Sequence, residues 1–379
     1  MKVYTKTKVI LFAIWVLFCI VALTNCGKSE GANGKKEIVM SDSMIVPLKP
    51  QYVTDPVTFD SDDPAIWINQ NDPSKSLIIG TDKGGEKGEG GLFVFDLEGN
   101  LDTTRSVRGI QRPNNVDIAY GFNLNGQIVD IAVTTERLTN KLRVFSLPEM
   151  KEIDNGGIYV FEGDSIKDPM GIALYTDPIT KDIYAIVGRK YGPENEYLWQ
   201  YKLVPNEKGY VEGELVRKFG KFSGVKEIEA IAVDSELGYV YYSDENVGVR
   251  KYYAHPDSSD TQIALFATND IKEDHEGISI YKRENGTGYL ILSDQQAGRF
   301  AIYPREGSEE DPDHHQLICY IPTSTVESDG NEVTSISLNP EFKKGLFVAM
   351  SDDKTFQIYN WNHIQSLIDR AILEKLNVQ

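Results

Sequence analysis

The stretch that decides the fold is Glu229-Ala-Ile-Ala-Val-Asp-Ser-Glu-Leu-Gly-Tyr-Val-Tyr-Tyr-Ser-Asp244-Glu245. It predicts two short buried strands joined by a tight acidic turn. A carboxylate stands before the first strand, and an acidic pair closes the second. If both ends of this hairpin point to one place, their oxygens form a site for a hard cation.

The same unit recurs six times along the chain. A β-branched or apolar strand begins at positions 77, 129, 183, 240, 290 and 346, at intervals of 50 to 57 residues. An aromatic-rich strand follows each copy, and another short strand precedes it. Six such copies favour an all-β fold, a six-bladed β-propeller, whereas the alternative β-sandwich would not give six regular units. The one helical pattern, Ile364 to Leu376, predicts a C-terminal packing helix.

The first residues differ in kind from the rest. Three lysines precede an apolar run of 16 residues, Val9 to Thr24, which is short for a membrane span and predicts a signal peptide over residues 1–25. Leu23-Thr24-Asn25-Cys26 resembles a lipobox, which implies a lipidated Cys26. Residues 26–45 are predicted as a linker and 46–379 as the propeller domain. We therefore expect a lipid-anchored protein of the bacterial cell envelope, in the outer membrane or periplasm.

Charge and cysteine content narrow the partners. The formal charge is −18, and it becomes −21 once the three lysines of residues 1–25 are removed. Such a surface repels nucleic acid and anionic lipid, so we expect no nucleic-acid partner and a monomeric protein. Cys319 would be the one thiol left after removal of Cys19 and lipidation of Cys26, which predicts no disulfide framework.

Acidic residues gather before the first strand of most units. If these strands are the innermost ones, their starts converge on one mouth of the central channel, where adjacent carboxylates need cations or raised pKa values. Calcium accepts about six to eight oxygen ligands, and the five histidines form no zinc motif. The alternative is that the acids only cap turns. Aligned on the isoleucines at 66, 118, 172, 231, 278 and 336, the preceding residues are Asp62 and Asp63, Asp117, Met170, Glu229, Glu276 and Glu332.

Basic residues form a second set, in the loops that follow the second strands. The first three units have Lys83, Arg137 and Arg189-Lys190 there, whereas the last three have Asp244-Glu245, Asp294 and Asp352-Asp353. In a propeller these loops share a face with the starts of the first strands. A face that is half basic and half acidic suits a polyanion held by cationic side chains on one side and by metal ions on the other.

These motifs together resemble a known family. From Val53 to Trp361 the chain resembles the β-propeller phytases, which are calcium-dependent phosphomonoesterases that act on inositol hexakisphosphate (phytate). The motifs that carry the resemblance are Asp62-Asp63-Pro64-Ala65-Ile66-Trp67, Asn114-Asn115-Val116-Asp117-Ile118, Glu229 through Glu245, Asp274-His275-Glu276-Gly277-Ile278 and Gly345-Leu-Phe-Val-Ala.

The resemblance implies that several calcium ions bridge the substrate phosphate and activate a water for attack at phosphorus. It assigns catalytic roles to Glu229, Glu245, Arg137 and Lys83, and phosphate binding to Lys83, Arg137, Arg189 and Lys190. The implied metal ligands are Asp62, Asp63, Glu229, Glu245, Asp274, Glu276 and Asp329.

Two departures and two alternatives accompany this interpretation. Met170 stands where the family commonly has a tyrosine, and the acidic loop before the last unit is shortened to Glu327–Glu332. The alternative functions are a non-catalytic envelope propeller that binds a ligand or partner protein, and a hydrolase of another phosphate ester or of a lactone.

Overall fold

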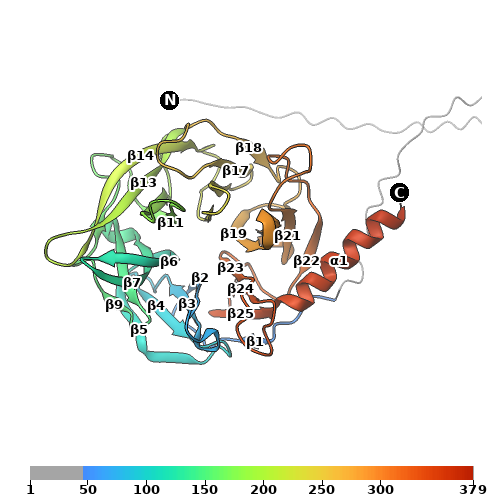
Figure 1. Cartoon of the computed structure of the whole chain (residues 1–379), viewed down its shortest axis with the longest axis horizontal. Helices are drawn as coiled ribbons and strands as arrows, with labels where there is room; N and C mark the ends of the chain where they lie inside the picture. Colours follow the sequence, from blue (N-terminus) through green and yellow to red (C-terminus); the bar gives the residue numbers. More distant parts are fainter. Residues whose placement is uncertain (1–45, 379) are drawn as a thin grey trace, which may run out of the picture. The chain divides into compact units, whose positions relative to one another are not determined.

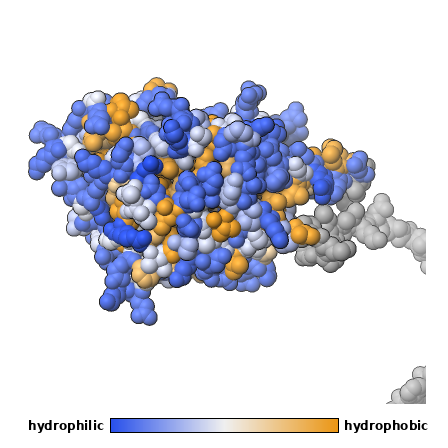
Figure 2. All heavy atoms as spheres, turned by 90° about the horizontal axis from the view of Figure 1, so that it is seen from below, coloured by the Kyte–Doolittle hydropathy of each residue, from blue (hydrophilic) through white to orange (hydrophobic). Residues whose placement is uncertain are grey.

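Six small sheets form a ring in the computed structural model, which describes residues 46–378 (Figure 1). The chain is thus a six-bladed β-propeller, as the repeats predicted. The predicted signal peptide, the lipidation site Cys26 and the linker lie outside the described residues. The described surface seen in Figure 2 is mostly hydrophilic, with scattered apolar residues.

The first three blades follow one another along the chain. Blade 1 contains β2 (Ser61–Trp67), β3 (Leu77–Asp82), β4 (Glu89–Phe95) and β5 (Leu101–Gln111). Blade 2 contains β6 (Pro113–Leu124), β7 (Gln127–Glu136), β8 (Lys141–Leu147) and β10 (Ile158–Tyr159), with β9 (Lys151–Glu152) also pairing with β8. Blade 3 contains β11 (Pro169–Thr176), β12 (Ile183–Arg189), β13 (Asn195–Pro205) and β14 (Val211–Lys221).

The last three blades repeat the plan. Blade 4 contains β15 (Ile231–Asp234), β16 (Tyr239–Asp244), β17 (Gly248–Tyr253) and β18 (Ala264–Phe266). Blade 5 contains β19 (His275–Lys282), β20 (Gly288–Asp294), β21 (Arg299–Pro304) and β22 (Cys319–Pro322). Blade 6 contains β23 (Asn331–Thr334), β24 (Leu346–Ser351), β25 (Thr355–Asn360) and β1 (Tyr52–Val53). The first strand of blades 1 to 5, and β23 in blade 6, lines the central channel.

The ring is closed by strands from the two ends of the domain. Strand β1 pairs with β25 in blade 6, with Tyr52 opposite Ile358. The N-terminal strand is thereby the outermost strand of the last blade, and it ties that blade to the first one.

Apolar side chains hold each blade to the next. The described residues form six apolar clusters, one at each junction between neighbouring blades. At the junction of blades 2 and 3, for example, Ile131 and Val133 pack with Ala185 and Val187. Full burial of one such aliphatic side chain contributes about 1.5 to 3 kcal/mol, so the junctions make the ring rigid and hold its mouth in a defined shape.

One helix follows the last blade. Helix α1 (Trp361–Val378) contains the segment predicted as helical, and it buries Trp361, Ile364 and Ile368. The Trp361 ring stacks on Tyr281 with centroids 3.7 Å apart, which anchors the helix to blade 5. Among residues 46–378, no helix is long and apolar enough to cross a membrane.

The innermost strand of blade 6 differs from the prediction. The alternating residues from Thr334 to Leu338 predicted a strand centred on Ile336, but β23 covers Asn331–Thr334. Ile336 is 48% exposed, whereas Leu338 lies in the core as part of a turn in which its N–H donates to the Phe342 carbonyl. The apolar alternation belonged to this turn rather than to a strand.

Candidate active site

The structure sets a common register for the six innermost strands. In β2, β6, β11 and β19 the pairing with the next strand shifts after the first residue, and a two-residue irregularity follows. In every blade, the residue two positions before the start of continuous pairing with the next strand has its side chain at the channel mouth. In β2, β6, β11 and β19 this residue is the first one of the irregularity. The six residues are Asp62, Asn114, Met170, Glu229, Glu276 and Asp329.

This register corrects the predicted carboxylate ring. Asp117 and Glu332 stand three positions further along their strands and line the channel instead of the mouth. Asp117 accepts the Leu174 N–H at 2.6 Å, and burial raises its pKa to about 6. Burial likewise raises the pKa of Glu332 to about 8. Four blades, not five, therefore give a carboxylate to the mouth. The alignment failed because Ile66 and Ile118 lie two positions further along their strands than the other strand isoleucines, and Ile336 lies outside β23.

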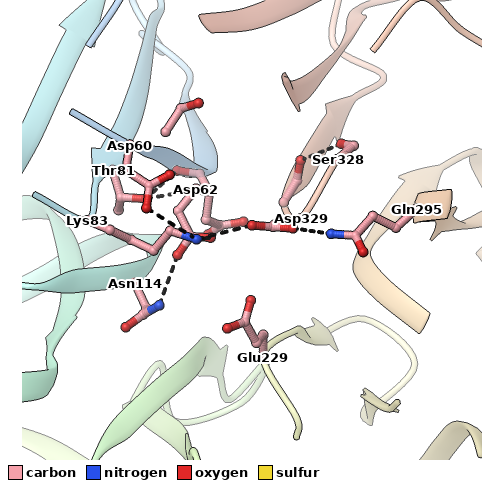
Figure 3. Close-up of polar contacts among 12 residues, drawn as sticks. Asp60, Asp62, Thr81, Lys83, Asn114, Glu229, Gln295, Ser328 and Asp329 are labelled. Atoms are coloured by element: carbon pink, nitrogen blue, oxygen red, sulfur yellow. Dashed lines mark hydrogen bonds and ion pairs between the residues drawn. The ribbon is translucent and has the colours of Figure 1, made fainter. Parts of the chain in front are cut away.

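A first carboxylate cluster consists of Asp62, Glu229 and Asp329, whose candidate ligand atoms lie within 4.8 Å of one another. The Lys83 Nζ lies 3.1 Å from both Asp62 Oδ1 and Asp329 Oδ2 (Figure 3). Asn114 Nδ2 donates to Asp62 Oδ2 at 3.1 Å. We call the three carboxylates Asp62, Glu229 and Asp329 the first cluster.

Close backbone approach brings the first cluster together across the ring seam. The Gly330 N–H donates to the Asp62 carbonyl at 3.1 Å. A Cβ atom at Gly330 would lie 2.4 Å from Asp63 Oδ1, so a larger residue would push blade 6 from blade 1. Glycine at this position lets Asp329 stand beside Asp62.

A second cluster consists of Glu245, Asp274 and Glu276, with candidate ligand atoms again within 4.8 Å of one another. The Lys226 Nζ lies 2.8 Å from Glu245 Oε2 and 2.5 Å from Asp274 Oδ2. Glu276 Oε2 is buried and accepts no hydrogen bond among the described residues. The hairpin from Glu229 to Glu245 thus contributes one carboxylate to each cluster.

Burial and neighbouring negative charges raise the pKa values of carboxylates in both clusters. Burial, and then the carboxylate of Asp62, raises the pKa of Glu229 well above its usual value. Burial, and then Glu229, does the same for Glu276. Burial also raises the pKa values of Glu245 and Asp329, each to about 7. A cation among these oxygens would favour their ionised forms, so both clusters could hold metal ions.

Cationic side chains and carboxylates of both clusters line one cavity of about 260 Å³. Arg137 Nη2 lies 3.9 Å from Glu229 Oε1, and Lys190 Nζ lies 2.8 Å from Glu227 Oε2. The cavity is lined by Lys83, Arg112, Arg137, Lys190, Lys226, Glu227, Glu229, Glu276, Gln295 and Asp329. Positive and negative groups therefore line one space, an arrangement that suits a phosphate ester together with metal ions.

Arg189 does not reach this cavity. It occupies the last position of β12, equivalent to Asp82 at the end of β3, and its side chain is fully buried. Its Nη1 donates to Asp164 Oδ2 at 2.7 Å, and its guanidinium lies 4.5 Å from the centre of the Phe161 ring. Side chains at this position turn into the blade and secure the neighbouring loop, so the next residue, Lys190, is the one that lines the cavity.

Asp63 also lies outside both clusters. Its Oδ2 accepts the Val116 N–H at 3.0 Å, and the residue lines the channel below the mouth. Met170, in contrast, is at the mouth but is fully buried and gives the ring no polar side-chain group. The remaining predicted site residues occupy the cavity or the two clusters.

Sequence reasoning missed several residues of the site: Arg112, Asn114, Lys226, Glu227 and Gln295. One signal was available for Gln295, which follows Asp294 as Lys83 follows Asp82. The comparison of the loops after the second strands took Asp294 for this unit, but Asp294 is the last residue of β20, as Asp82 is of β3, so Gln295 is the equivalent of Lys83. Arg112 lies in the connection between two blades and belongs to no repeat, so only the fold brings it to the site.

The fold and the site together define a class: a six-bladed propeller whose channel mouth combines carboxylate clusters with cationic side chains. The chain matches the phytase family over residues 17–374. It is 32% identical to a 3-phytase of Bacillus subtilis (strain 168), over 82% of each chain. The chain therefore belongs to the phytase family, which confirms the predicted family and the predicted enzyme class, a phosphoric monoester hydrolase.

Proposed function

We propose that the protein is a calcium-dependent phosphomonoesterase that hydrolyses inositol hexakisphosphate to lower inositol phosphates and phosphate. One observation carries this proposal: carboxylates from both clusters and five cationic side chains line a single cavity at the channel mouth. Membership of the phytase family and the similarity to a 3-phytase support the choice of substrate.

The chemistry of the donors fits calcium. All six residues of the two clusters offer carboxylate oxygens, the ligands that calcium prefers, and no histidine or cysteine belongs to either cluster. Glu276 Oε2 is a buried acceptor without a hydrogen-bond donor, as a ligand atom for a cation would be. Asp62, Glu229 and Asp329 would hold one ion, and Glu245, Asp274 and Glu276 another.

Bound calcium would supply charge neutralisation at the phosphate oxygens and a lowered pKa of a nearby water. The chain's own cations have a separate task. Lys83 and Arg137 lie beside the first cluster, so they can bind phosphate oxygens and stabilise the negative charge that develops there. Lys190 lies across the cavity and binds further oxygens of the same polyanion. Glu229 contacts the Arg137 guanidinium and orients it toward the cavity.

Phosphate release from inositol hexakisphosphate by the purified protein tests this proposal, with calcium and with a chelator. We expect release only with calcium, and a large loss in Glu229→Gln and Arg137→Gln. Arg105→Gln is the matched control, because Arg105 pairs with Asp102 on β5 and lies outside the cavity. Release that ignores calcium, or that both active-site variants retain, contradicts the proposal.

Two other outcomes would point to the alternative functions. If calcium raises Tm but no phosphate is released from any ester, the mouth is a binding site on a non-catalytic propeller. If another phosphate ester is hydrolysed with a higher kcat/KM than inositol hexakisphosphate, the substrate is wrong and the site is right.

We further propose that the protein is exported and anchored in the bacterial envelope through a lipid on Cys26, and that it is a monomer. Metabolic labelling with a radioactive fatty acid tests the anchor: wild type should be labelled and pelleted with membranes, and Cys26→Ser should be neither. Light scattering of the detergent-free domain tests the monomer.

A further inference from the structure

Lys226 brings a positive charge into the second cluster. Its Nζ lies 2.8 Å from Glu245 Oε2 and 2.5 Å from Asp274 Oδ2, which belong to two of the three carboxylates of that cluster. The third, Glu276, keeps a buried Oε2 that accepts no hydrogen bond among the described residues. Lys226 therefore neutralises part of the second cluster and leaves one candidate ligand atom without a partner.

Other groups of the protein hold two of these carboxylates in place. Asn246 Nδ2 donates to Asp274 Oδ1 at 2.6 Å, and Gln296 Nε2 donates to Asp274 Oδ2 at the same distance. Glu245 directly follows β16, and its N–H donates to the Glu227 carbonyl at 3.2 Å. These donors are neutral, so they fix the carboxylates without adding the charge that Lys226 supplies.

The Lys226 side chain is free to move between the cluster and solvent. It belongs to the connection between β14 and β15, where residues 223–226 are all exposed, and the side chain itself is 44% exposed. Lys83, which stands between two carboxylates of the first cluster, is only 13% exposed. A flexible lysine side chain on an exposed loop moves its ammonium group into water by rotation about its own bonds.

Lys226 and a calcium ion would use the same oxygen atoms. Calcium binds carboxylate oxygens at about 2.3 to 2.6 Å, so an ion on Glu245 Oε2 and Asp274 Oδ2 would lie at most about 5 Å from the Lys226 nitrogen where it now stands. A divalent and a monovalent cation at this distance repel each other strongly in a partly buried site. Calcium binding therefore requires the ammonium group to withdraw.

We propose that Lys226 is a built-in counterion of the second cluster that calcium must displace, and that it thereby lowers the calcium affinity of this site. The inference rests on the proposed function for the identity of the metal ion. Lys226 controls ion binding in this scheme and takes no part in the chemical step.

Calorimetric titration of calcium into the purified protein, without substrate, tests the competition. In Lys226→Met, which keeps a long side chain and removes its charge, we expect the Kd of the second cluster to fall about 10- to 100-fold. Lys226→Gln should give the same change, and Lys226→Arg should stay close to wild type. Addition of Glu276→Gln to Lys226→Met should abolish the gain, because it removes a ligand of the same cluster.

Two matched controls separate contact from general charge. Lys202→Met removes the same charge outside the cavity, where Lys202 pairs with Asp182. Lys190→Met removes it inside the cavity but outside both clusters, beside Glu227. Each should change the Kd less than about threefold. The proposal is overturned if either control lowers the Kd as much as Lys226→Met, if Lys226→Met and Lys226→Gln leave it unchanged, or if the gain survives Glu276→Gln.

Thermal unfolding distinguishes competition from a structural role of Lys226. Lys226→Met should have a lower Tm than wild type in a chelator, because the carboxylates lose their counterion. Saturating calcium should remove most of that difference, because the ion then stabilises the folded variant. An equal fall of Tm in both conditions would show that Lys226 only supports the loop, and would contradict the proposal.

The same titration separates this proposal from the proposed function. If wild type releases no phosphate from inositol hexakisphosphate but Lys226→Met binds calcium about tenfold or more tightly than wild type, the activity is wrong and the competition stands. If phosphate is released and the two proteins bind calcium equally, the activity stands and the role of Lys226 fails.

Discussion

Charged groups are buried both at the channel mouth and at the opposite end of blades 4 and 5, but their surroundings differ. At the channel mouth, Glu229 and Glu276 lie among other carboxylates, and their pKa values are raised well above normal, first by burial and then by those neighbours. At the far end of blades 4 and 5, Asp234 receives two hydrogen bonds from Arg305, at 2.5 and 2.7 Å. Burial alone would raise the Asp234 pKa, but this pairing lowers it overall.

A second matched set extends the far end. Lys251 is fully buried, and its Nζ donates to Asp313 Oδ1 at 2.7 Å and lies 3.3 Å from His315 Nε2. The ring of Tyr239 lies 3.9 Å below this ammonium group. We call Asp234, Arg305, Lys251, Asp313 and His315 the far-end network.

This difference indicates that the far-end network stabilises the fold, whereas the mouth is built to bind a ligand. The far-end network satisfies its charges within the protein, so its contribution ends with folding. At the mouth the six carboxylates of the two clusters outnumber the cations beside them, which are Lys83, Arg137 and Lys226. Like charges therefore remain together there, an arrangement that is stable only if some of the groups are neutral or if a further cation joins them. Substitutions in each region test this difference, because those at the mouth should affect activity and those in the far-end network should affect stability.

The largest effect is expected at the mouth. Glu229→Gln should lower kcat/KM for inositol hexakisphosphate by about 10³- to 10⁴-fold, because it removes a carboxylate ligand and the partner of Arg137. Tm measured with a chelator should stay nearly unchanged, because glutamine resembles the protonated glutamate that the raised pKa implies. A large fall of that Tm would show that the first cluster is structural.

At the far end, the opposite result is expected. Asp234→Asn should lower the free energy of unfolding by about 3 to 5 kcal/mol, because it leaves the fully buried Arg305 without its paired carboxylate. Urea unfolding measures this, and activity per folded molecule should not change. Glu236→Gln is the control: Glu236 contacts the same guanidinium at 2.7 Å but is 54% exposed, so a loss of less than about 1 kcal/mol is expected.

Acid should weaken the far-end network. Burial lowers the pKa of His315 to about 4, so the folded protein keeps this ring neutral while the unfolded chain protonates it near pH 6.5. The unfolded state then binds more protons between pH 6.5 and 4, and the His315 contribution to stability, about 3 kcal/mol, is lost as pH falls through that window.

Other groups titrate in the same pH range, so the effect of His315 must be measured as the difference between wild type and a variant in how unfolding free energy depends on pH. His315→Asn should flatten the dependence of unfolding free energy on pH relative to wild type, while His363→Asn, at an exposed position on α1, should reproduce the wild-type slope. Parallel curves for all three proteins would exclude His315 as the source.

The smallest effect concerns the cation on the far side of the cavity. Lys190→Gln should raise KM for inositol hexakisphosphate about five- to tenfold with little change in kcat, because the proposed function has Lys190 bind substrate oxygens away from the reacting phosphate. Lys202→Gln is the matched control, since Lys202 pairs with Asp182 at 2.8 Å on β13 and lies outside the cavity. Equal effects of the two substitutions would indicate long-range charge rather than contact.

The sequence by itself determined the architecture and much of the site. The strands recur about every 50 residues, so the six blades followed from the sequence repeat alone. The helix near residue 364 followed from the helical spacing of its apolar residues. Glu229, Glu245, Asp274, Glu276 and Asp329 were recognisable because each stands beside an apolar strand, in an order that the resemblance to phytases shares.

Tertiary structure decided which neighbours of those residues share the site. Register depends on pairing between strands, and the pairing places Asp117 and Glu332 three positions beyond the mouth residues of their blades, in the channel. Adjacent side chains on a strand point to opposite sides, so Lys190 reached the cavity while Arg189 was buried. Arg112 came to the cavity through a connection between blades, where only the closed ring determines what lies beside it.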